Sequence, residues 1–194
     1  MGTVRESIDE GVAEFLLAQH VFFVGTAPTR DGHVNVSPKG LAGSFAVLGP
    51  LRVAYLDLTG SGAETIAHLR ADGRICLMFC AFDGPPRIVR LHGRGEFVAL
   101  GDPGFDDLAG RFPARPGARA VIVVEVDRVS DSCGFAVPLL EHVGDRDQLV
   151  RWAAKRGEDG LATYRREKNA RSIDGLPALS SARLRRDEAA RARR

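Results

Sequence analysis

Residues 74–98 read RICLMFCAFDGPPRIVRLHGRGEFV, and this stretch decides the fold. Two long segments rich in β-branched and aromatic residues flank Asp-Gly-Pro-Pro, a sequence typical of the turn of a hairpin. The same patterning predicts further strands at residues 20–28, 34–37, 51–58 and 120–129. Asp31-Gly32 separates the first two of these as a second hairpin signal. Because hairpins join antiparallel strands, the sequence predicts one antiparallel sheet of six strands.

Helical periodicity frames this sheet and dominates the C-terminal part. Apolar residues recur at helical spacing in residues 7–18 and 63–70, and a third short helix is expected after Asp102. Beyond residue 131, apolar spacing predicts two helices up to about residue 168. Strands first and helices later indicate an α+β fold, in which an antiparallel barrel hides the strand edges. We expect three parts, namely a barrel domain (1–131), a helical extension packed on it (132–182) and a basic tail (183–194).

Composition and charge exclude several classes of protein. The chain has 194 residues, of which 44% are hydrophobic and 27% charged, as in an ordinary soluble globular domain. Residues 183–194 carry a net charge of +4, so the other 182 residues carry −2 and have no general attraction for nucleic acid. The tail is expected to be a solvated helix end, with RNA or an acidic surface as the alternative. No apolar run approaches the roughly 20 residues of a membrane span, so no membrane partner is expected.

The cysteines indicate a compartment and no metal. Cys76, Cys80 and Cys133 are an odd and small set, which argues against a disulfide framework and for a reducing compartment. The polar N-terminus is unlike a secretory signal, and we therefore expect a cytoplasmic protein. No histidine stands near the Cys76–Cys80 pair, so no metal site is predicted. No catalytic residue is nominated, because the sequence contains neither a Gly-x-Ser-x-Gly elbow nor a His-Glu-x-x-His motif.

The stretch LDLTGSGAETIAHL, residues 56–69, is the first candidate binding element. A strand runs through a Gly/Ser/Thr loop into a helix, so backbone N–H groups and the helix dipole are available to a phosphate. The alternative is structural, because Ser61 and Glu64 have the spacing of a capping box that needs no ligand. The segment is not a P-loop, since no Gly-Lys-Ser/Thr follows it.

The stretch VNVSPKG, residues 34–40, is the second candidate. Strand alternation places Asn35, Ser37 and Lys39 on one side, until Pro38 is expected to stop the strand. Lys39 is the only lysine in the first 154 residues and stands beside two polar side chains. It is therefore a candidate to neutralise an anion, with a solvated lysine at a strand end as the alternative.

Three segments in order resemble the pyridoxamine 5'-phosphate oxidase-like, FMN-binding split-barrel family. They are VFFVGTAPTRDGHVNVSPKG (21–40), TGSGAETIAHLRADGRICLMF (59–79) and PPRIVRLHGRGEFV (85–98). The resemblance covers about residues 6–129, and the C-terminal part resembles the extension of a subgroup of mostly uncharacterised members. It implies that the six-stranded antiparallel barrel is a split barrel.

The resemblance also implies a function and a site. It implies a homodimer with two FMN sites at the subunit interface and a flavin-dependent oxidation or reduction of an unknown small molecule. The cofactor-binding residues carried over by position are Asn35, Val36, Ser37, Lys39, Thr59, Ser61, Gly62, Glu64 and Thr65. The alternatives are an F420-dependent reductase on the same fold, a flavin-binding protein without catalysis, and a haem-binding relative.

Two departures from the vitamin B6 oxidase itself bear on the ligand. That enzyme's Ser-Arg-Lys triplet aligns with residues 63–65, so Glu64 places a negative charge beside the expected phosphate. Either Lys39 and an arginine compensate, or FMN binds weakly, or the ligand differs. The arginines expected to compensate are Arg52, Arg87 and Arg90. The oxidase's C-terminal Arg-x-His motif is missing, so pyridoxamine phosphate is not the expected substrate.

Overall fold

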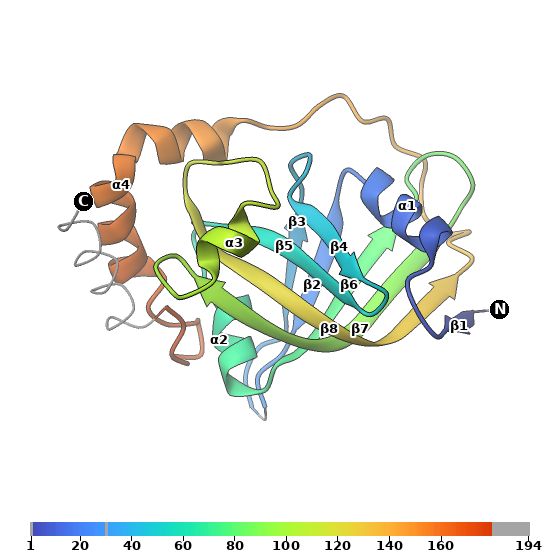
Figure 1. Cartoon of the computed structure of the whole chain (residues 1–194), viewed down its shortest axis with the longest axis horizontal. Helices are drawn as coiled ribbons and strands as arrows, with labels where there is room; N and C mark the ends of the chain where they lie inside the picture. The colour runs from blue at the N-terminus through green and yellow to red at the C-terminus, as the bar shows by residue number, and fades with distance from the viewer. Residues whose placement is uncertain (1, 30, 180–194) are drawn as a thin grey trace.

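A computed structural model describes residues 2–29 and 31–179, and the predicted basic tail at 183–194 lies outside this range. Within the described residues the chain forms eight strands and four helices (Figure 1). The strands are β1 (Thr3–Arg5), β2 (Phe22–Thr26), β3 (Asn35–Lys39), β4 (Phe45–Gly49), β5 (Arg52–Leu58), β6 (Arg74–Cys80), β7 (Ile88–Ala99) and β8 (Ala118–Ser132). The helices are α1 (Glu10–Ala18), α2 (Glu64–Ala71), α3 (Phe105–Ala109) and α4 (Gln148–Lys168).

All strand pairings are antiparallel, which confirms the predicted α+β class. The order in the sheet is β3-β2-β6-β7-β8-β5-β4, and β1 adds to β8. The six predicted strands all form, and β1 and β4 raise the number in the described chain to eight. Neither addition has a clear sequence signal, because β1 has three residues and β4 reads FAVLG without alternation. Pairing with β8 and β5 decides their conformation.

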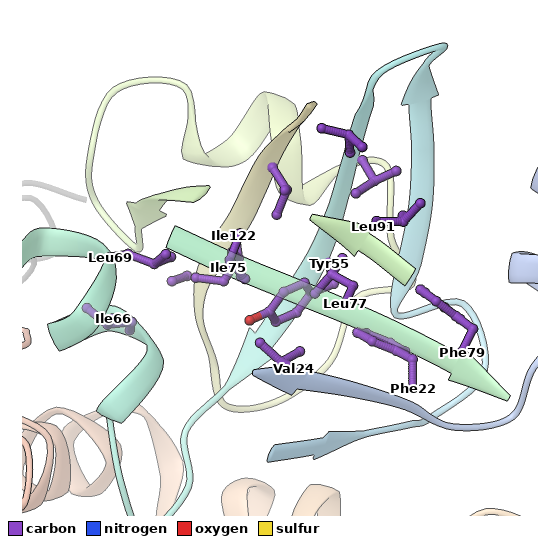
Figure 2. Close-up of a cluster of buried hydrophobic side chains, with 14 of the residues drawn as sticks. Phe22, Val24, Tyr55, Ile66, Leu69, Ile75, Leu77, Phe79, Leu91 and Ile122 are labelled. Carbon is purple, nitrogen blue, oxygen red and sulfur yellow. The ribbon is translucent and has the colours of Figure 1, made fainter. Parts of the chain in front are cut away.

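The larger of two hydrophobic clusters fills the inside of the curled sheet. Figure 2 shows Phe22 from β2, Tyr55 from β5, and Leu77 and Phe79 from β6 pointing into it. The rings of Phe22 and Phe79 stack with their centroids 5.1 Å apart. Helix α2 packs against β7 and β2 and contributes the buried side chains of Ile66 and Leu69 to the same cluster. These contacts fix α2 relative to the sheet.

The sheet does not close. Strands β3 and β4 end the pairing order, and no pairing joins them in the part of the chain that is described. Strand β5 also extends beyond β4, since the β4 pairing reaches only Tyr55 while β5 continues to Leu58. Pro38 does not stop β3 as predicted, because an edge strand tolerates a residue that lacks an N–H. A seam is therefore left between β3 and the last residues of β5.

The C-terminal segment packs back along this seam. Helix α4 is two helices joined at Gly157 (φ 64°, ψ 177°), as the sequence predicted. The following residues run against α2, where Arg70 Nη1 donates to the carbonyl oxygen of Ala178 at 2.8 Å. Ala178 and Leu179 are buried in the main core cluster. No helix in residues 2–29 and 31–179 combines the length and apolar character needed to cross a membrane.

Candidate functional site

A cavity of about 390 Å³ lies at the open seam. Strand β3, the end of β5, the loop at residues 60–62 and the first turn of α2 form its walls, together with two arginines and the start of α4. It is lined by Asn35, Ser37, Pro38, Lys39, Gly40, Leu41, Ser44, Leu56, Leu58, Gly60, Ser61, Gly62, Glu64, Thr65, Arg115, Arg119 and Leu149. The two sequence stretches singled out above therefore meet at one cavity.

Two cations hold one buried carboxylate at the base of this cavity. Asp57 has 1% of its surface exposed, and its two oxygens accept from Lys39 Nζ at 2.9 Å and Arg119 Nε at 2.7 Å. Burial alone raises the pKa of Asp57, but the charges and hydrogen bonds of Arg119 and Lys39 outweigh it and hold the pKa at about 2. The carboxylate is therefore ionised at neutral pH, and one positive charge of the three-residue group is left over.

An amide and hydroxyl network ties β3 to α2 beside the cavity. Asn35 Nδ2 donates to Thr65 Oγ1 on α2 and to Thr26 Oγ1 on β2, both at 3.3 Å. Ser37 Oγ donates to Asn35 Oδ1 at 3.1 Å. Behind them the fully buried His68 lies with Nδ1 3.0 Å from Thr26 Oγ1. This network fixes the polar side of β3 towards the cavity.

Among the described residues no side chain caps the first turn of α2, so the capping box given as the structural alternative does not form. The helix begins at Glu64 after Ala63, whose side chain has no oxygen. The Glu64 carboxylate instead accepts from the backbone N–H of Ile173, with both oxygens at 3.2 Å. The tertiary contact with the C-terminal segment thus replaces the local one, and the first-turn N–H groups receive no bond from a capping side chain.

Residues at the C-terminal end of α4 form hydrogen bonds to the loop that precedes α2. Asn169 Oδ1 accepts from Arg119 Nη1 at 2.8 Å, and Asn169 Nδ2 donates to the carbonyl oxygen of Gly60 at 3.0 Å. Arg165, 2% exposed, donates through Nη1 to Thr59 Oγ1 at 3.5 Å. The C-terminal segment therefore contacts the cavity wall at successive positions of one loop.

Seven of the nine residues carried over from the resemblance line the cavity, namely Asn35, Ser37, Lys39, Ser61, Gly62, Glu64 and Thr65. The other two are placed elsewhere. Val36 is 64% exposed on the opposite side of β3, as strand alternation requires. Thr59 is fully buried beneath the loop, where its side chain accepts from Arg165.

The three arginines expected to compensate for Glu64 do not line the cavity. Arg52 pairs with Glu125 at 2.8 Å, Arg87 pairs with Asp131 at 2.7 Å, and Arg90 donates to Ser132. The cavity instead contains Arg115 and Arg119, which the sequence pattern did not predict.

A signal for Arg119 was present in the sequence. Asp57 is the one acid in a strand that is otherwise apolar after Arg52, and Arg119 is the one basic residue at the apolar start of β8. The two strands pair, with Asp57 opposite Ala120, so an unmatched acid and an unmatched base at neighbouring positions favour a buried ion pair.

Fold and cavity together define an open antiparallel barrel with a cationic pocket at its seam. The family model described as pyridoxamine 5'-phosphate oxidase matches residues 8–133. The chain therefore belongs to the pyridoxamine 5'-phosphate oxidase family, and the resemblance drawn from the sequence is confirmed.

Two similar proteins extend this finding. The pyridoxamine 5'-phosphate oxidase family protein ustO of Aspergillus flavus is 44% identical over 195 residues, covering 91% of this chain and 78% of that protein. The crystal structure of a variant of HupZ from Group A Streptococcus superposes with a TM-score of 0.51 at 19% identity. It covers 64% of this chain and 99% of that chain, and it supports the fold alone.

Proposed function

We propose that the chain binds FMN at the seam cavity and uses it to oxidise or reduce a small molecule. The observation that carries the proposal is the cationic cavity at the start of α2. There, Lys39, Arg115 and Arg119 line the same cavity as the N-terminus of α2, which no side chain of the described residues caps. A phosphate at such a place gains both the charge and the backbone donors.

The charge balance of the cavity fits a phosphate. Three cations line it, and two carboxylates, Asp57 and Glu64, stand against them, which leaves a net charge of +1. Asp57 is neutralised by Lys39 and Arg119, and the Glu64 carboxylate is occupied by the Ile173 N–H. The Glu64 carboxylate therefore makes a structural hydrogen bond to the C-terminal segment. Arg115 and Arg119 supply the positive charge that compensates for it in the cavity.

The rest of the cavity fits an aromatic ring system and its polar chain. Leu41, Leu56, Leu58 and Leu149 provide apolar wall, and Ser37, Ser61 and Thr65 provide hydroxyl groups. When bound, FMN supplies the hydride and electron transfer. The side chains named here bind and orient it and exclude water from its surroundings.

We further propose that the protein works as a homodimer in the cytoplasm. Val34 and Val36 are 72% and 64% exposed on the β2–β3 hairpin beside the cavity, and a second copy would cover them. The three cysteines are free, which suits a reducing compartment. Size-exclusion chromatography with light scattering tests the dimer, and a monomer at micromolar concentration would contradict it.

The deciding experiment is a visible absorption spectrum of freshly purified protein, followed by denaturation and chromatographic identification of the released molecule. Released FMN supports the proposal, and turnover of reduced FMN with an acceptor then separates an enzyme from a flavin-binding protein. Released F420 would replace FMN by the deazaflavin alternative. Protein that stays colourless after incubation with FMN would overturn flavin binding.

A pair of variants links the ligand to this cavity. Lys39→Ala is expected to raise the Kd for FMN about tenfold, because a hydrogen bond to a charged group contributes on the order of 1.5–3 kcal/mol. Lys155→Ala, which removes an exposed lysine of α4, is the matched control and should leave the Kd unchanged. Equal effects of the two variants would place the flavin elsewhere.

A further inference from the structure

We propose that Asn169 is a positioning residue that holds both Arg119 and the loop at residues 60–62 in place for the phosphate of the ligand. The inference rests on the proposed function for the identity of the ligand. It assigns a role in the cofactor site to the C-terminal extension, which lies outside the stretch that matches the family model.

Both the backbone and the side chain of Asn169 are hydrogen-bonded to neighbouring elements. The residue has none of its surface exposed and ends α4, where its backbone N–H donates to the carbonyl of Arg165 at 2.9 Å. Its own carbonyl accepts from the N–H of Leu179 at 3.0 Å. Its side chain accepts from Arg119 at 2.8 Å and donates to Gly60 O at 3.0 Å. A buried amide with both ends occupied joins the Arg119 side chain to the loop at residues 60–62, beyond the point where the pairing of β5 with β8 ends at Leu58 and Ala118.

Asn169 sets the orientation of the guanidinium of Arg119. That group is planar, so two hydrogen bonds from different nitrogens fix both its direction and its plane. Nε donates to Asp57 and Nη1 donates to Asn169, and the residue still lines the cavity. Without the amide, Asp57 would be the one hydrogen-bond partner left to the Arg119 guanidinium among the described residues, and the plane of the guanidinium could turn about that contact.

Asn169 also fixes the loop at residues 60–62, whose glycines do not by themselves restrict the backbone. The loop contains Gly60 and Gly62, which have the largest backbone freedom of any residue type. Asn169 binds the first of these glycines, while Arg165 and the N–H of Ile173 hold the residues on either side at Thr59 and Glu64. The central contact therefore determines where the loop's N–H groups point.

This role predicts a selective loss. In the proposed site Arg119 and the loop, which line the cavity, would face the phosphate end of FMN, whereas riboflavin has the same ring system without the phosphate. If Asn169 positions these groups, its removal weakens FMN and leaves riboflavin almost unchanged. If Asn169 only stabilises the fold, both flavins weaken by the same factor.

The test compares three variants of the full chain. Asn169→Ala removes both bonds, Asn169→Leu removes both bonds while nearly keeping the shape and adding no charge, and Glu167→Ala is an exposed control in the same helix. The Kd values for FMN and riboflavin are measured by flavin fluorescence. We expect Asn169→Ala and Asn169→Leu to raise the Kd for FMN about tenfold, with less than a twofold change for riboflavin and no change in the control. If Asn169→Ala does not fold, the nearly isosteric Leu variant decides. Unchanged FMN binding, or an equal loss for both flavins, would overturn the inference.

A second measurement needs no flavin. Amide hydrogen exchange at residues 60–64 should accelerate at least tenfold in the Asn169 variants, while exchange in β7 and β8 stays as in the wild type. If the wild type binds no flavin but the Asn169 variants show this local acceleration, the proposed function is refuted and the positioning of the loop is upheld. Unchanged exchange in the loop would refute the positioning role itself.

Discussion

Lys39 and Asp57 bridge the open seam of the barrel, with Nζ of Lys39 2.9 Å from Oδ1 of Asp57. Lys39 ends the edge strand β3, and Asp57 lies in the part of β5 that extends beyond β4. No backbone hydrogen bond of the sheet joins these two strands among the described residues. The Lys39–Asp57 side-chain pair therefore links the two strands at the base of the cavity, as backbone hydrogen bonds link neighbouring strands elsewhere in the sheet.

Replacing Asp57 by Asn should destabilise the protein by about 3 kcal/mol, because loss of one partner leaves buried cations without their counter-charge. Arg119, 5% exposed, is the more affected of the two cations. Urea unfolding monitored by circular dichroism measures the change. Asp127→Asn, the same substitution at an exposed position of β8, is the control and should cost less than about 0.5 kcal/mol. A loss for Asp57→Asn no larger than that of the control would show that the pair adds no stability.

The lowered pKa of Asp57 makes the stability of the fold depend on pH. The pKa of Asp57 is about 2 in the folded chain, against an ordinary value of 3.8. A lowered pKa stabilises the folded state above the ordinary value, and the contribution is lost as the pH falls from about 4 to about 2. Its size is roughly 2 kcal/mol.

Unfolding free energies at pH 5, 4, 3 and 2 test this dependence. The difference between wild type and Asp57→Asn should shrink over that range, because protonation removes from the wild type what the variant already lacks. Asp131, whose pKa is also lowered in the folded chain, changes in both proteins and cancels in the difference. A difference that stays constant from pH 5 to pH 2 would contradict the assignment.

The sequence predicts the class of fold well because alternation and turn residues are local signals. It predicts β7 and β8 within a few residues, since long apolar alternation has no competing interpretation. It misses β4, whose apolar residues FAVLG carry no period and become a strand only by pairing with β5. Tertiary contact decides such segments.

The residues of the candidate site likewise divide into those that local sequence patterns predict and those that depend on tertiary contacts. Asn35, Ser37 and Lys39 follow from alternation along one strand, and Val36 was carried over from the resemblance although its side chain faces away. Arg115 and Arg119 were not predicted, because their approach depends on a pairing between distant strands and on the path of a loop. The contacts of Asn169 depend on where a helix of the extension ends, which no local pattern specifies.

The hairpin tip and the C-terminal turn are joined by His33 and Asp174, with Nδ1 2.7 Å from Oδ1. The hydrogen bond and the charge of Asp174 raise the pKa of His33 above 6.5. A raised pKa stabilises the folded state below pH 6.5, and that contribution disappears as the pH rises through the folded pKa.

Imidazole titration by NMR measures this effect directly. The wild type should show a His33 pKa above 6.5, and Asp174→Asn should return it towards that value. An identical His33 pKa in both proteins would show that the contact does not persist in solution.

Gly117 is the point where the chain that leads to Arg119 passes between α4 and the cavity loop. Its φ is +85°, and an added Cβ would lie 2.9 Å from the Cβ of Ala153 in α4. Gly84 has φ +63°, and no atom of the described residues beyond its chain neighbours lies within 4 Å of a Cβ added there, so it has the backbone strain without the contact. Gly84→Ala should therefore lower the free energy of unfolding by about 1 kcal/mol. Gly117→Ala should lower it by about 1–3 kcal/mol more, because α4 must shift or the backbone before β8 must distort. The Gly117 carbonyl also accepts from the Thr59 N–H at 2.7 Å, so this shift reaches the loop that precedes α2. Urea unfolding of both variants measures the comparison, and equal losses would mean that α4 yields without cost at this contact.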